Sequence, residues 1–502
     1  MDKNQYDVIV VGSGISGMTA GIIAAKQGEK VLVLEQHSVP GGLMQTYKRK
    51  GLIFPTGVHR LGSLNQGQPL WYYFSYLDIL DRLNLVKLDD DCFEKIYFPG
   101  KVYKIPMGHD RYKERLHQYF PDDTKAINSY FSDLKKIISN IGMYDPSVRP
   151  NKDLSMQYTG SMDDYLTSIN ASSRLKSLLF ANNPLYGIPS KDCTMLTHFI
   201  ISDCYLNSSF RIDEDKTPLA TALVDSFTSH GGKLITNALV KKLITKDGTA
   251  IGVILSNKPE SSQEKIFSKK VIYSGHPGMI LDICPPELFR PAYRKRLENA
   301  QDSFGVFGVA LKFKNQYCPV KNNDAFVYDS WDIDSHYYRK NILEDDKAGV
   351  VFLSALPHSS DQDYSVTALT GVSDKENLIL TQYYKESKED KYKKAKDMIS
   401  KKMMDNLRTA FPDILDHAQI VDTYSPVTFS RYTLTKNGSA YGIIKTANRF
   451  LESMFQPATR IKNFFLTGQS ISFSGIHGSI VSSIDLCSTL YGKDYLMNKI
   501  VK

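Results

Sequence analysis

The N-terminal part of the chain alternates between apolar runs and a glycine-rich turn. Residues 6–11 are mostly apolar and lead directly into residues 12–17, Gly-Ser-Gly-Ile-Ser-Gly. Small and apolar residues follow at 18–25, and a second β-branched run at 31–34 ends in the carboxylate of Glu35. The pattern predicts a strand, a tight turn, a helix and a second strand, which together form the βαβ unit of a dinucleotide-binding domain.

The three glycines of this turn have separate roles in such a unit. Gly12 permits the tight turn, Gly14 lets the backbone approach a pyrophosphate, and Gly17 lets the helix pack closely on the strand. The N-terminus of the helix offers free N–H groups to the phosphates. An acid about 20 residues later binds the adenosine ribose, so Glu35 is expected to do so and to disfavour a 2′-phosphate.

Later apolar patterns extend the same domain. Residues 231–278 alternate apolar and polar positions with glycines between them, which predicts a β-meander with a polar turn before residue 270. Residues 463–468 predict another strand ending in glycine, followed by an apolar helix at 479–490. We therefore expect one nucleotide domain from residues 1–65, 211–290 and 456–502, and a substrate-binding, membrane-contact lobe from 66–210 and 291–455.

Composition narrows the class of protein. A chain of 502 residues with 42% hydrophobic and 23% charged residues is typical of a globular protein with more than one lobe. No apolar run is long enough to span a bilayer, and no cleavable leader precedes the first strand, so a cytoplasmic location is expected. The six cysteines show no metal-ligand or disulfide spacing, and no metal is expected.

The formal charge of +8 has two interpretations. It is compatible with contact to an anionic membrane surface, or with a lysine-rich proteome. No basic stripe or recognition module for nucleic acid is present. The charged stretch 385–402 is interpreted as a solvated helix face.

Several further blocks accompany the glycine turn, and those at 56–59, 438–442 and 466–469 are far more specific than it. They lie, in chain order, at 31–37, 41–42, 50–59, 184–189, 425–429, 438–442 and 466–469. With them the chain resembles, over nearly its whole length, the FAD-dependent phytoene desaturase, carotenoid isomerase and retinol saturase family, and is most similar to the retinol saturase branch. The resemblance implies an α/β fold: a Rossmann-like, GR2-type FAD-binding domain built from discontinuous segments, a second α+β substrate lobe and a helical membrane-contact region.

The resemblance also implies the residues that hold FAD. They come from the glycine turn, the acidic strand end, the 41–43 and 56–59 blocks, the meander and the C-terminal segment. The expected FAD-binding residues are Gly12, Gly14, Ile15, Ser16, Gly17, Glu35, Gln36, Gly41, Gly42, Leu43, Thr56, Gly57, Val58, His59, Val240, Gly468, Gln469, Gly475 and Ile476.

The chain departs from the family pattern at four places. Pro55 replaces an acid before the 56–59 block, Leu43 replaces an arginine, and Ser470 replaces an aspartate. Residues 212–217 replace a glycine-rich turn. FAD binding is expected to survive these changes, whereas the flavin environment and the substrate pocket are expected to differ.

The expected reaction is saturation of one C=C bond of a retinol- or carotenoid-like polyene by hydride transfer from reduced flavin. A carotenoid desaturase or a cis–trans isomerase would use the same substrate site beside the flavin, and the fold does not distinguish among the three reactions. A non-redox prenyl- or lipid-binding escort on the same scaffold and an amine-oxidase-like flavoenzyme are further alternatives. No second dinucleotide motif is present, so electrons would pass to or from external NAD(P)H, a quinone or oxygen.

Four side chains are candidate acids near the flavin: His59, Tyr441, Tyr186 and His477, with the first two leading. Arg60 is interpreted either as a group that stabilises reduced flavin or as a surface residue. The aromatic run 71–76 either lines a polyene tunnel or belongs to a helix core. Peripheral contact with the inner face of the membrane is expected in the helical part between about 110 and 200.

Overall fold

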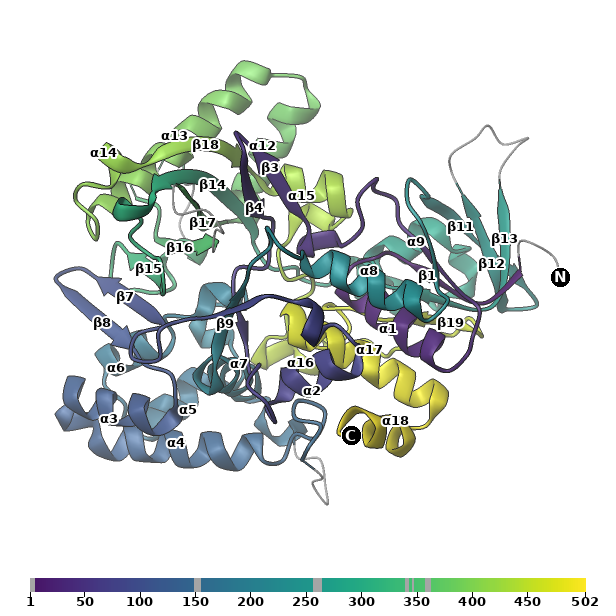
Figure 1. Ribbon diagram of the computed structural model, residues 1–502, viewed down its shortest axis with the longest axis horizontal. Helices are drawn as coiled ribbons and strands as arrows, with labels where there is room; N and C mark the ends of the chain where they lie inside the picture. Colours follow the sequence, from purple (N-terminus) through teal and green to yellow (C-terminus); the bar gives the residue numbers. More distant parts are fainter. Residues whose placement is uncertain (1–4, 149–154, 256–263, 339–342, 345–346, 357–362) are drawn as a thin grey trace.

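The computed structural model describes residues 5–148, 155–255, 264–338, 343–344, 347–356 and 363–502. Two large sheets form the centres of two regions that lie side by side (Figure 1). The chain passes between these regions several times, so each region contains segments that are distant in sequence.

The first sheet has seven strands drawn from three parts of the chain. They are β1 (Gln5–Val11), β2 (Val31–Leu34), β10 (Lys233–Ile235), β11 (Val240–Lys246), β12 (Thr249–Leu255), β13 (Lys265–Tyr273) and β19 (Phe464–Leu466). The pairs β10–β2, β2–β1, β1–β13 and β13–β19 are parallel. The N-terminal, middle and C-terminal segments therefore share one sheet.

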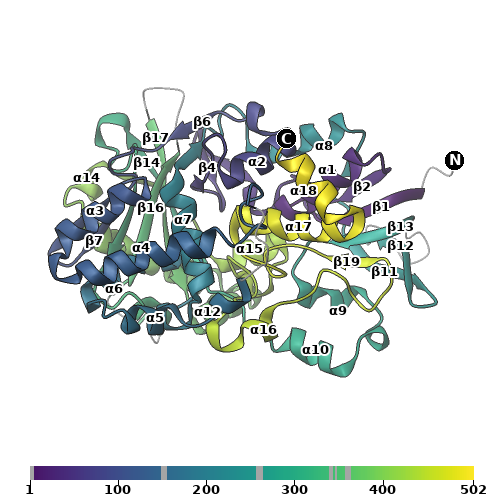
Figure 2. The ribbon, with the colours of Figure 1, turned by 90° about the horizontal axis from the view of Figure 1, so that it is seen from below.

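Helices cover both faces of this sheet. Val8 and Val10 of β1 pack toward one face and Ile9 toward the other, as alternation along a strand requires. The first face packs against α1 (Ile15–Lys26), α8 (Leu219–Ser229), α17 (Gly475–Tyr491) and α18 (Lys493–Ile500). The second packs against α9 (Ile280–Ile283) and α10 (Pro291–Glu298). Figure 2 shows α17 and α18 beside α1, although they are almost a whole chain apart.

The predicted β-meander is confirmed, because β11 pairs antiparallel with β12 and β12 with β13. Its predicted polar turn falls within 256–263 and lies outside the described residues. β13 pairs with β12 along its first half and with β19 along its second half. This single strand therefore joins the meander to the C-terminal segment.

The second sheet, in the order β18-β14-β17-β16-β15-β7-β8, is mostly antiparallel. Its strands are β7 (Glu94–Phe98), β8 (Lys101–Ile105), β14 (Gly305–Lys314), β15 (Asp324–Tyr328), β16 (Val350–Leu356), β17 (Asp363–Val372) and β18 (Gln419–Tyr424). Helices α12 (Asp374–Lys385), α13 (Glu389–Arg408) and α14 (Ile414–His417) lie near it in Figure 1.

The interpretation of residues 385–402 as a solvated face is wrong for one side of α13. Ile399 and Met403 are fully buried against the second sheet. Most lysines of the segment lie on the other side of α13. Because lysines are so frequent there, the helical spacing of the apolar residues was not recognised in the sequence.

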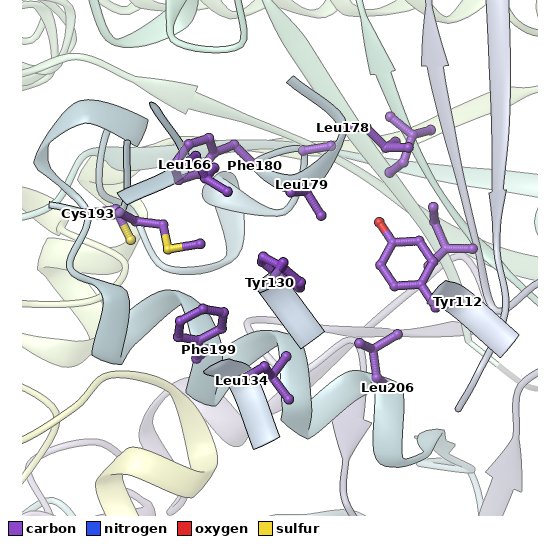
Figure 3. Close-up of a cluster of buried hydrophobic side chains, with 14 of the residues drawn as sticks. Tyr112, Tyr130, Leu134, Leu166, Leu178, Leu179, Phe180, Cys193, Phe199 and Leu206 are labelled. Carbon is purple, nitrogen blue, oxygen red and sulfur yellow. The ribbon is translucent and has the colours of Figure 1, made fainter. Parts of the chain in front are cut away.

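A helical layer lies at the lower left of Figure 1 and covers the other face of the second sheet. It contains α3 (His109–Tyr119), α4 (Thr124–Ile138), α5 (Met162–Ser168), α6 (Ser173–Leu179) and α7 (Met195–Asn207). Figure 3 shows part of its interior, where the rings of Tyr130 and Phe199 pack against each other. The predicted α/β fold class with a second α+β region is confirmed.

Shorter elements link the two regions. The strands are β3 (Thr46–Arg49), β4 (Leu52–Pro55), β5 (Leu61–Gly62), β6 (Leu85–Lys87) and β9 (Ser209–Ile212), and the helices are α2 (Pro69–Tyr76), α11 (Ser335–Tyr338), α15 (Pro426–Thr433) and α16 (Phe450–Ser453). Across the described ranges, no helix combines the length and apolar character needed to cross a membrane. The exact lobe boundaries and the membrane-contact region remain predictions.

Candidate functional site

The larger part of the candidate site is a cavity of about 750 Å³, which we call the dinucleotide cavity. It is bordered by the turn after β1, the end of β2, the start of β11, the segment after β13 and the segment after β19. In parallel sheets, ligands bind outside the carboxyl ends of the strands, and this cavity has that position.

The glycine turn shapes one wall of the dinucleotide cavity. Gly12 has a φ of +100°, which favours glycine. A Cβ on Gly17 would lie 2.0 Å from the Gly12 carbonyl oxygen, so only glycine permits this packing of α1. A Cβ on Gly14 would meet no protein atom within 4 Å, because Gly14 faces the cavity. No side chain caps the start of α1, so its first N–H groups can bind an anion.

Glu35 is held in place at the end of β2. Its Oε2 accepts hydrogen bonds from the Ser13 backbone N–H (2.9 Å) and the Ser13 hydroxyl (2.6 Å), and its Oε1 accepts one from the His37 N–H (2.8 Å). The Ser13 hydroxyl also accepts a hydrogen bond from the Gly41 N–H. Ser13 thus links three parts of the cavity wall, a role that the sequence analysis did not identify.

The C-terminal segment closes the opposite wall. Gly468 has a φ of +124°, and Gly475, at the start of α17, has a φ of +77° with open space where a Cβ would be. The N-cap residue of α17, Ser474, makes no side-chain capping bond. A second helix N-terminus therefore faces the site, with N–H groups able to stabilise negative charge.

A second cavity of about 240 Å³ adjoins the first, and we call it the apolar cavity. Aliphatic and aromatic side chains form most of its wall. One face of α7 contributes Thr197, Ile200, Ile201, Cys204 and Tyr205, at the spacing of adjacent helical turns. The two cavities share Leu43, Gly57, Val58, Ala440, Tyr441, Gly475 and Ile476.

Two buried histidines line the apolar cavity. The His477 Nε2 lies 2.9 Å from the Tyr144 carbonyl oxygen, so it carries the proton, and its Nδ1 has no hydrogen-bond partner in the described part of the chain. The His59 Nε2 likewise has no partner among the described residues. Burial lowers the pKa of each imidazole to about 4, so both are neutral at pH 7.

The two candidate tyrosines lie in different surroundings. Tyr441 borders both cavities, and burial raises the pKa of its phenol above the ordinary value. Tyr186 borders neither cavity. Its hydroxyl contacts Asn183 and lies 3.3 Å from the His198 Nδ1, inside the helical layer. Tyr186 lines a smaller cavity together with Tyr441 and Phe473, and its catalytic role remains a prediction.

The interpretation of Arg60 as a surface residue is wrong. The side chain is buried rather than on the surface, and its Nη1 lies 2.7 Å from Glu94 Oε2 and 3.3 Å from Asp324 Oδ2. Arg60 lines the apolar cavity and does not line the dinucleotide cavity, and a role toward a reduced flavin remains a prediction. Two acids of the second sheet pair with it, which the sequence did not indicate.

The aromatic run 71–76 lies in α2 and packs into the hydrophobic core rather than forming a tunnel wall. Tyr73 and Phe74 are fully buried among apolar side chains near α18, and neither borders the apolar cavity. The aromatic wall of that cavity comes instead from residues such as Phe352, Phe429 and Phe473, which are widely separated in the sequence.

Most of the residues expected to bind FAD line the dinucleotide cavity. These are Gly12, Gly14, Ile15, Ser16, Glu35, Gln36, Gly41, Gly42, Leu43, Gly57, Val58, Val240, Gly468, Gln469, Gly475 and Ile476. Thr56 and His59 line the apolar cavity, and Gly17 lies beneath the turn. Their roles toward a cofactor remain predictions. Within the described ranges, no group of three His, Cys, Asp or Glu side chains could hold a metal ion.

Known proteins resemble this chain at three levels. A family model described as an NAD(P)-binding Rossmann-like domain matches residues 10–77. The all-trans-retinol 13,14-reductase of Danio rerio is 25% identical over 539 residues, covering 98% of this chain and 86% of the relative. A chloroplastic prolycopene isomerase of an Oncidium hybrid cultivar is 23% identical over 527 residues, covering 95% and 83%.

A structure of a putrescine oxidase variant has the same fold, with a TM-score of 0.64, 14% identity and 99% coverage of both chains. This likeness concerns the fold alone. The two curated relatives align along nearly the whole chain, through both cavities and both sheets. The chain is therefore similar, along nearly its whole length, to the all-trans-retinol 13,14-reductases and the prolycopene isomerases, and this is the resemblance that its sequence predicts.

Proposed function

We propose that this protein is an FAD-dependent oxidoreductase that reduces one C=C bond of a conjugated, retinol- or carotenoid-like polyene. The observation that carries the proposal is the junction of the two cavities. A cavity with a dinucleotide-binding turn meets an apolar cavity along a shared wall that includes Gly57, Tyr441 and Ile476. Cofactor and substrate bound in these cavities would meet at that wall.

The residues of the dinucleotide cavity fit FAD. The open space at Gly14 and the uncapped start of α1 suit a pyrophosphate, and Glu35 suits the adenosine ribose. Gly475 and the start of α17 lie where the two cavities meet, so they would hold the flavin end. When bound, a flavin supplies hydride transfer to or from a carbon of the substrate.

The protein's own side chains would bind the polyene and deliver a proton. The aliphatic and aromatic wall of the apolar cavity excludes water and orients a planar chain. Saturation also requires a proton for the neighbouring carbon. Tyr441 is our proposed donor, because it borders both cavities and its phenol is protonated at pH 7.

The histidines are weaker candidates for this proton transfer. The His477 Nδ1 is an acceptor, since its Nε2 proton is directed to the Tyr144 carbonyl. His59 borders only the apolar cavity, whereas Tyr441 borders both cavities. We therefore expect Tyr441→Phe to slow turnover by about 10²-fold or more while flavin binding is retained.

An anaerobic assay tests the proposal. The flavin of the purified protein is reduced, all-trans-retinol is added, and the polyene and flavin absorbance are followed together. Loss of polyene absorbance with one equivalent of flavin oxidised supports saturation. Isomerisation of prolycopene while the flavin stays reduced would replace saturation with isomerisation. A protein that cannot be loaded with FAD would contradict the redox proposal and favour a lipid escort.

The electron partner and the location extend this proposal. NAD(P)H, a quinone or oxygen would exchange electrons with the flavin from outside, since the residues provide one dinucleotide turn. We propose a cytoplasmic protein with peripheral membrane contact through the helical layer, because a polyene substrate is nearly insoluble in water.

A further inference from the structure

One lysine lies inside the protein at the edge of the site. Lys445 is only 4% exposed, and its Nζ donates hydrogen bonds to the backbone carbonyls of Ile443 and Ser470, at 2.8 Å each. Lysine side chains are almost never this deeply buried unless they are paired. Here the Nζ joins the carbonyl oxygens of two separate segments, so the side chain forms a cross-link between them.

The cross-link joins two parts of the site wall. Tyr441, on the same segment as Lys445, borders both cavities, and Ser470 borders the dinucleotide cavity in the turn after β19 (residues 467–470). The Ile443 N–H also donates to the Ser470 Oγ at 3.1 Å. A Cβ on Gly442 would lie 2.2 Å from that Oγ, so the two segments are in close contact. The Lys445 Nζ is therefore one hydrogen bond away from a residue of the dinucleotide cavity.

The surroundings of Lys445 make its charge sensitive to pH. Burial lowers the pKa of the amine and the carboxylate of Asp302 raises it, which leaves a pKa of about 7. Asp302 is itself paired, with its Oδ1 2.7 Å from the His276 Nε2. Tyr186 and Tyr441 border the same small cavity as Lys445, and burial raises the pKa of both phenols, so both are neutral between pH 6 and pH 9. Lys445 thus carries a positive charge below pH 7 and loses it as the pH rises.

A positive charge at this place affects the redox equilibrium of a bound flavin. A flavin that takes up two electrons and one proton carries one negative charge more than the oxidised form. A cation nearby in the protein interior stabilises that negative charge, because water screens the interaction only weakly there. The charge of Lys445 should therefore favour the reduced flavin below pH 7 and have little effect at high pH.

We propose that Lys445 is a positioning residue, which ties the Tyr441 segment to the turn after β19 and holds one positive charge behind that turn, so that the bound flavin is reduced more easily. The inference rests on the proposed function and adds a residue to it. Lys445 borders the small cavity of about 20 Å³ beside the two larger ones. It acts through Tyr441, Ser470 and the electric field of its charge, and it does not need to contact the flavin or the substrate.

The test is the midpoint potential of the bound flavin, measured by anaerobic titration with dithionite and a reference dye, without any polyene. At pH 6, Lys445→Met should disfavour the reduced flavin by about tenfold relative to the wild type, which lowers the midpoint potential by about 30 mV. At pH 9 the wild-type amine is neutral, so the two proteins should have the same potential. Equal potentials at pH 6, or a difference that persists at pH 9, would overturn the proposal.

Two further variants separate the charge from the structure. Lys445→Gln keeps an N–H donor for the carbonyls without a charge, so it should retain flavin and show the same lowered potential at pH 6. It also decides the question if Lys445→Met does not fold. Lys396→Met is the matched control, because Lys396 is partly buried on α13, donates to the Thr423 carbonyl at 2.6 Å and has a pKa lowered by burial. It should leave the potential unchanged at both pH values, and a shift like that of Lys445→Met would contradict the proposal.

The outcomes separate this inference from the proposed function. If the potential depends on Lys445 as expected but the anaerobic assay with retinol shows no saturation, the role of Lys445 stands and the proposed reaction fails. If saturation occurs but Lys445→Met and the wild type have equal potentials at pH 6, the proposed function stands and the role of Lys445 is wrong.

Discussion

Glycines of the turn after β1 and of the C-terminal segment contribute to the wall of the dinucleotide cavity, whereas the apolar cavity is bounded mainly by aliphatic and aromatic side chains from many segments. In the first, open space at Gly14 and Gly475 defines the shape. In the second, the face of α7 and scattered aromatic residues define it. The first should therefore respond most to an added Cβ, and the second to a change in side-chain volume.

The largest effect is expected from Gly14→Val. Gly14 has ordinary extended dihedral angles, and a Cβ there would meet no protein atom, so the protein should fold. The added side chain would occupy the dinucleotide cavity and weaken FAD binding by about 10³-fold, or about 4 kcal/mol. Flavin content and thermal unfolding are the measurements. Gly160→Val is the matched control, since that glycine also has open space but lies on the surface. Equal flavin content in both variants would contradict this account.

A somewhat smaller effect is expected in the other cavity. Ile201→Trp would fill the apolar cavity from the face of α7 and weaken retinol binding by about 10²-fold, or about 2.7 kcal/mol. FAD binding should be unchanged, because Ile201 does not border the dinucleotide cavity. Leu378→Trp, on the exposed side of α12, is the control. Loss of flavin together with retinol would show that the two cavities are not separable.

The apolar cavity should also make stability depend on pH. The pKa of His477 is about 4 in the folded protein and about 6.5 when exposed, so the unfolded state binds more protons between these values. Stability should therefore fall as the pH falls from 6.5 toward 4. At pH 5 the loss from His477 is about 2 kcal/mol relative to pH 7. Denaturant unfolding of His477→Gln should show a smaller pH dependence, and parallel curves for both proteins would count against burial of a neutral imidazole.

The smallest effect is expected at Ser13. Ser13→Ala removes the hydroxyl that bonds Glu35 and accepts from the Gly41 N–H, while the Ser13 backbone N–H still holds Glu35. FAD binding should weaken by about fivefold, close to 1 kcal/mol, as measured by flavin release during dilution. Ser139→Ala, at the end of α4, provides the baseline. A loss as large as that in Gly14→Val would mean that side chains, not backbone, define this cavity.

The same contrast explains what could be predicted from sequence. The glycine turn and Glu35 have fixed local spacing, and sixteen of the residues that the family resemblance implies for FAD binding line one cavity. The β-meander followed from its alternation and glycines. These features depend on local backbone geometry, which short patterns specify.

The apolar cavity was harder to predict because its wall depends on tertiary packing. No sequence motif includes Tyr205 or Phe352. The buried position of Arg60 could not be predicted, because its partners Glu94 and Asp324 are distant from it in the chain. The aromatic run 71–76 was the most conspicuous signal, yet it belongs to the core of α2. The spacing of Thr197, Ile201 and Cys204 on one helical face is a local signal of the cavity wall, in addition to the blocks at 56–59 and 438–442.

The most direct test of the account is whether a ligand in the apolar cavity contacts the flavin. Oxidised holoenzyme is titrated with all-trans-retinol while the visible spectrum of the flavin is recorded. The shared wall at Gly57, Tyr441 and Ile476 predicts a saturable shift of the flavin bands, with the same midpoint as retinol binding and absent in Ile201→Trp. Saturable retinol binding that leaves the flavin spectrum unchanged would contradict the account.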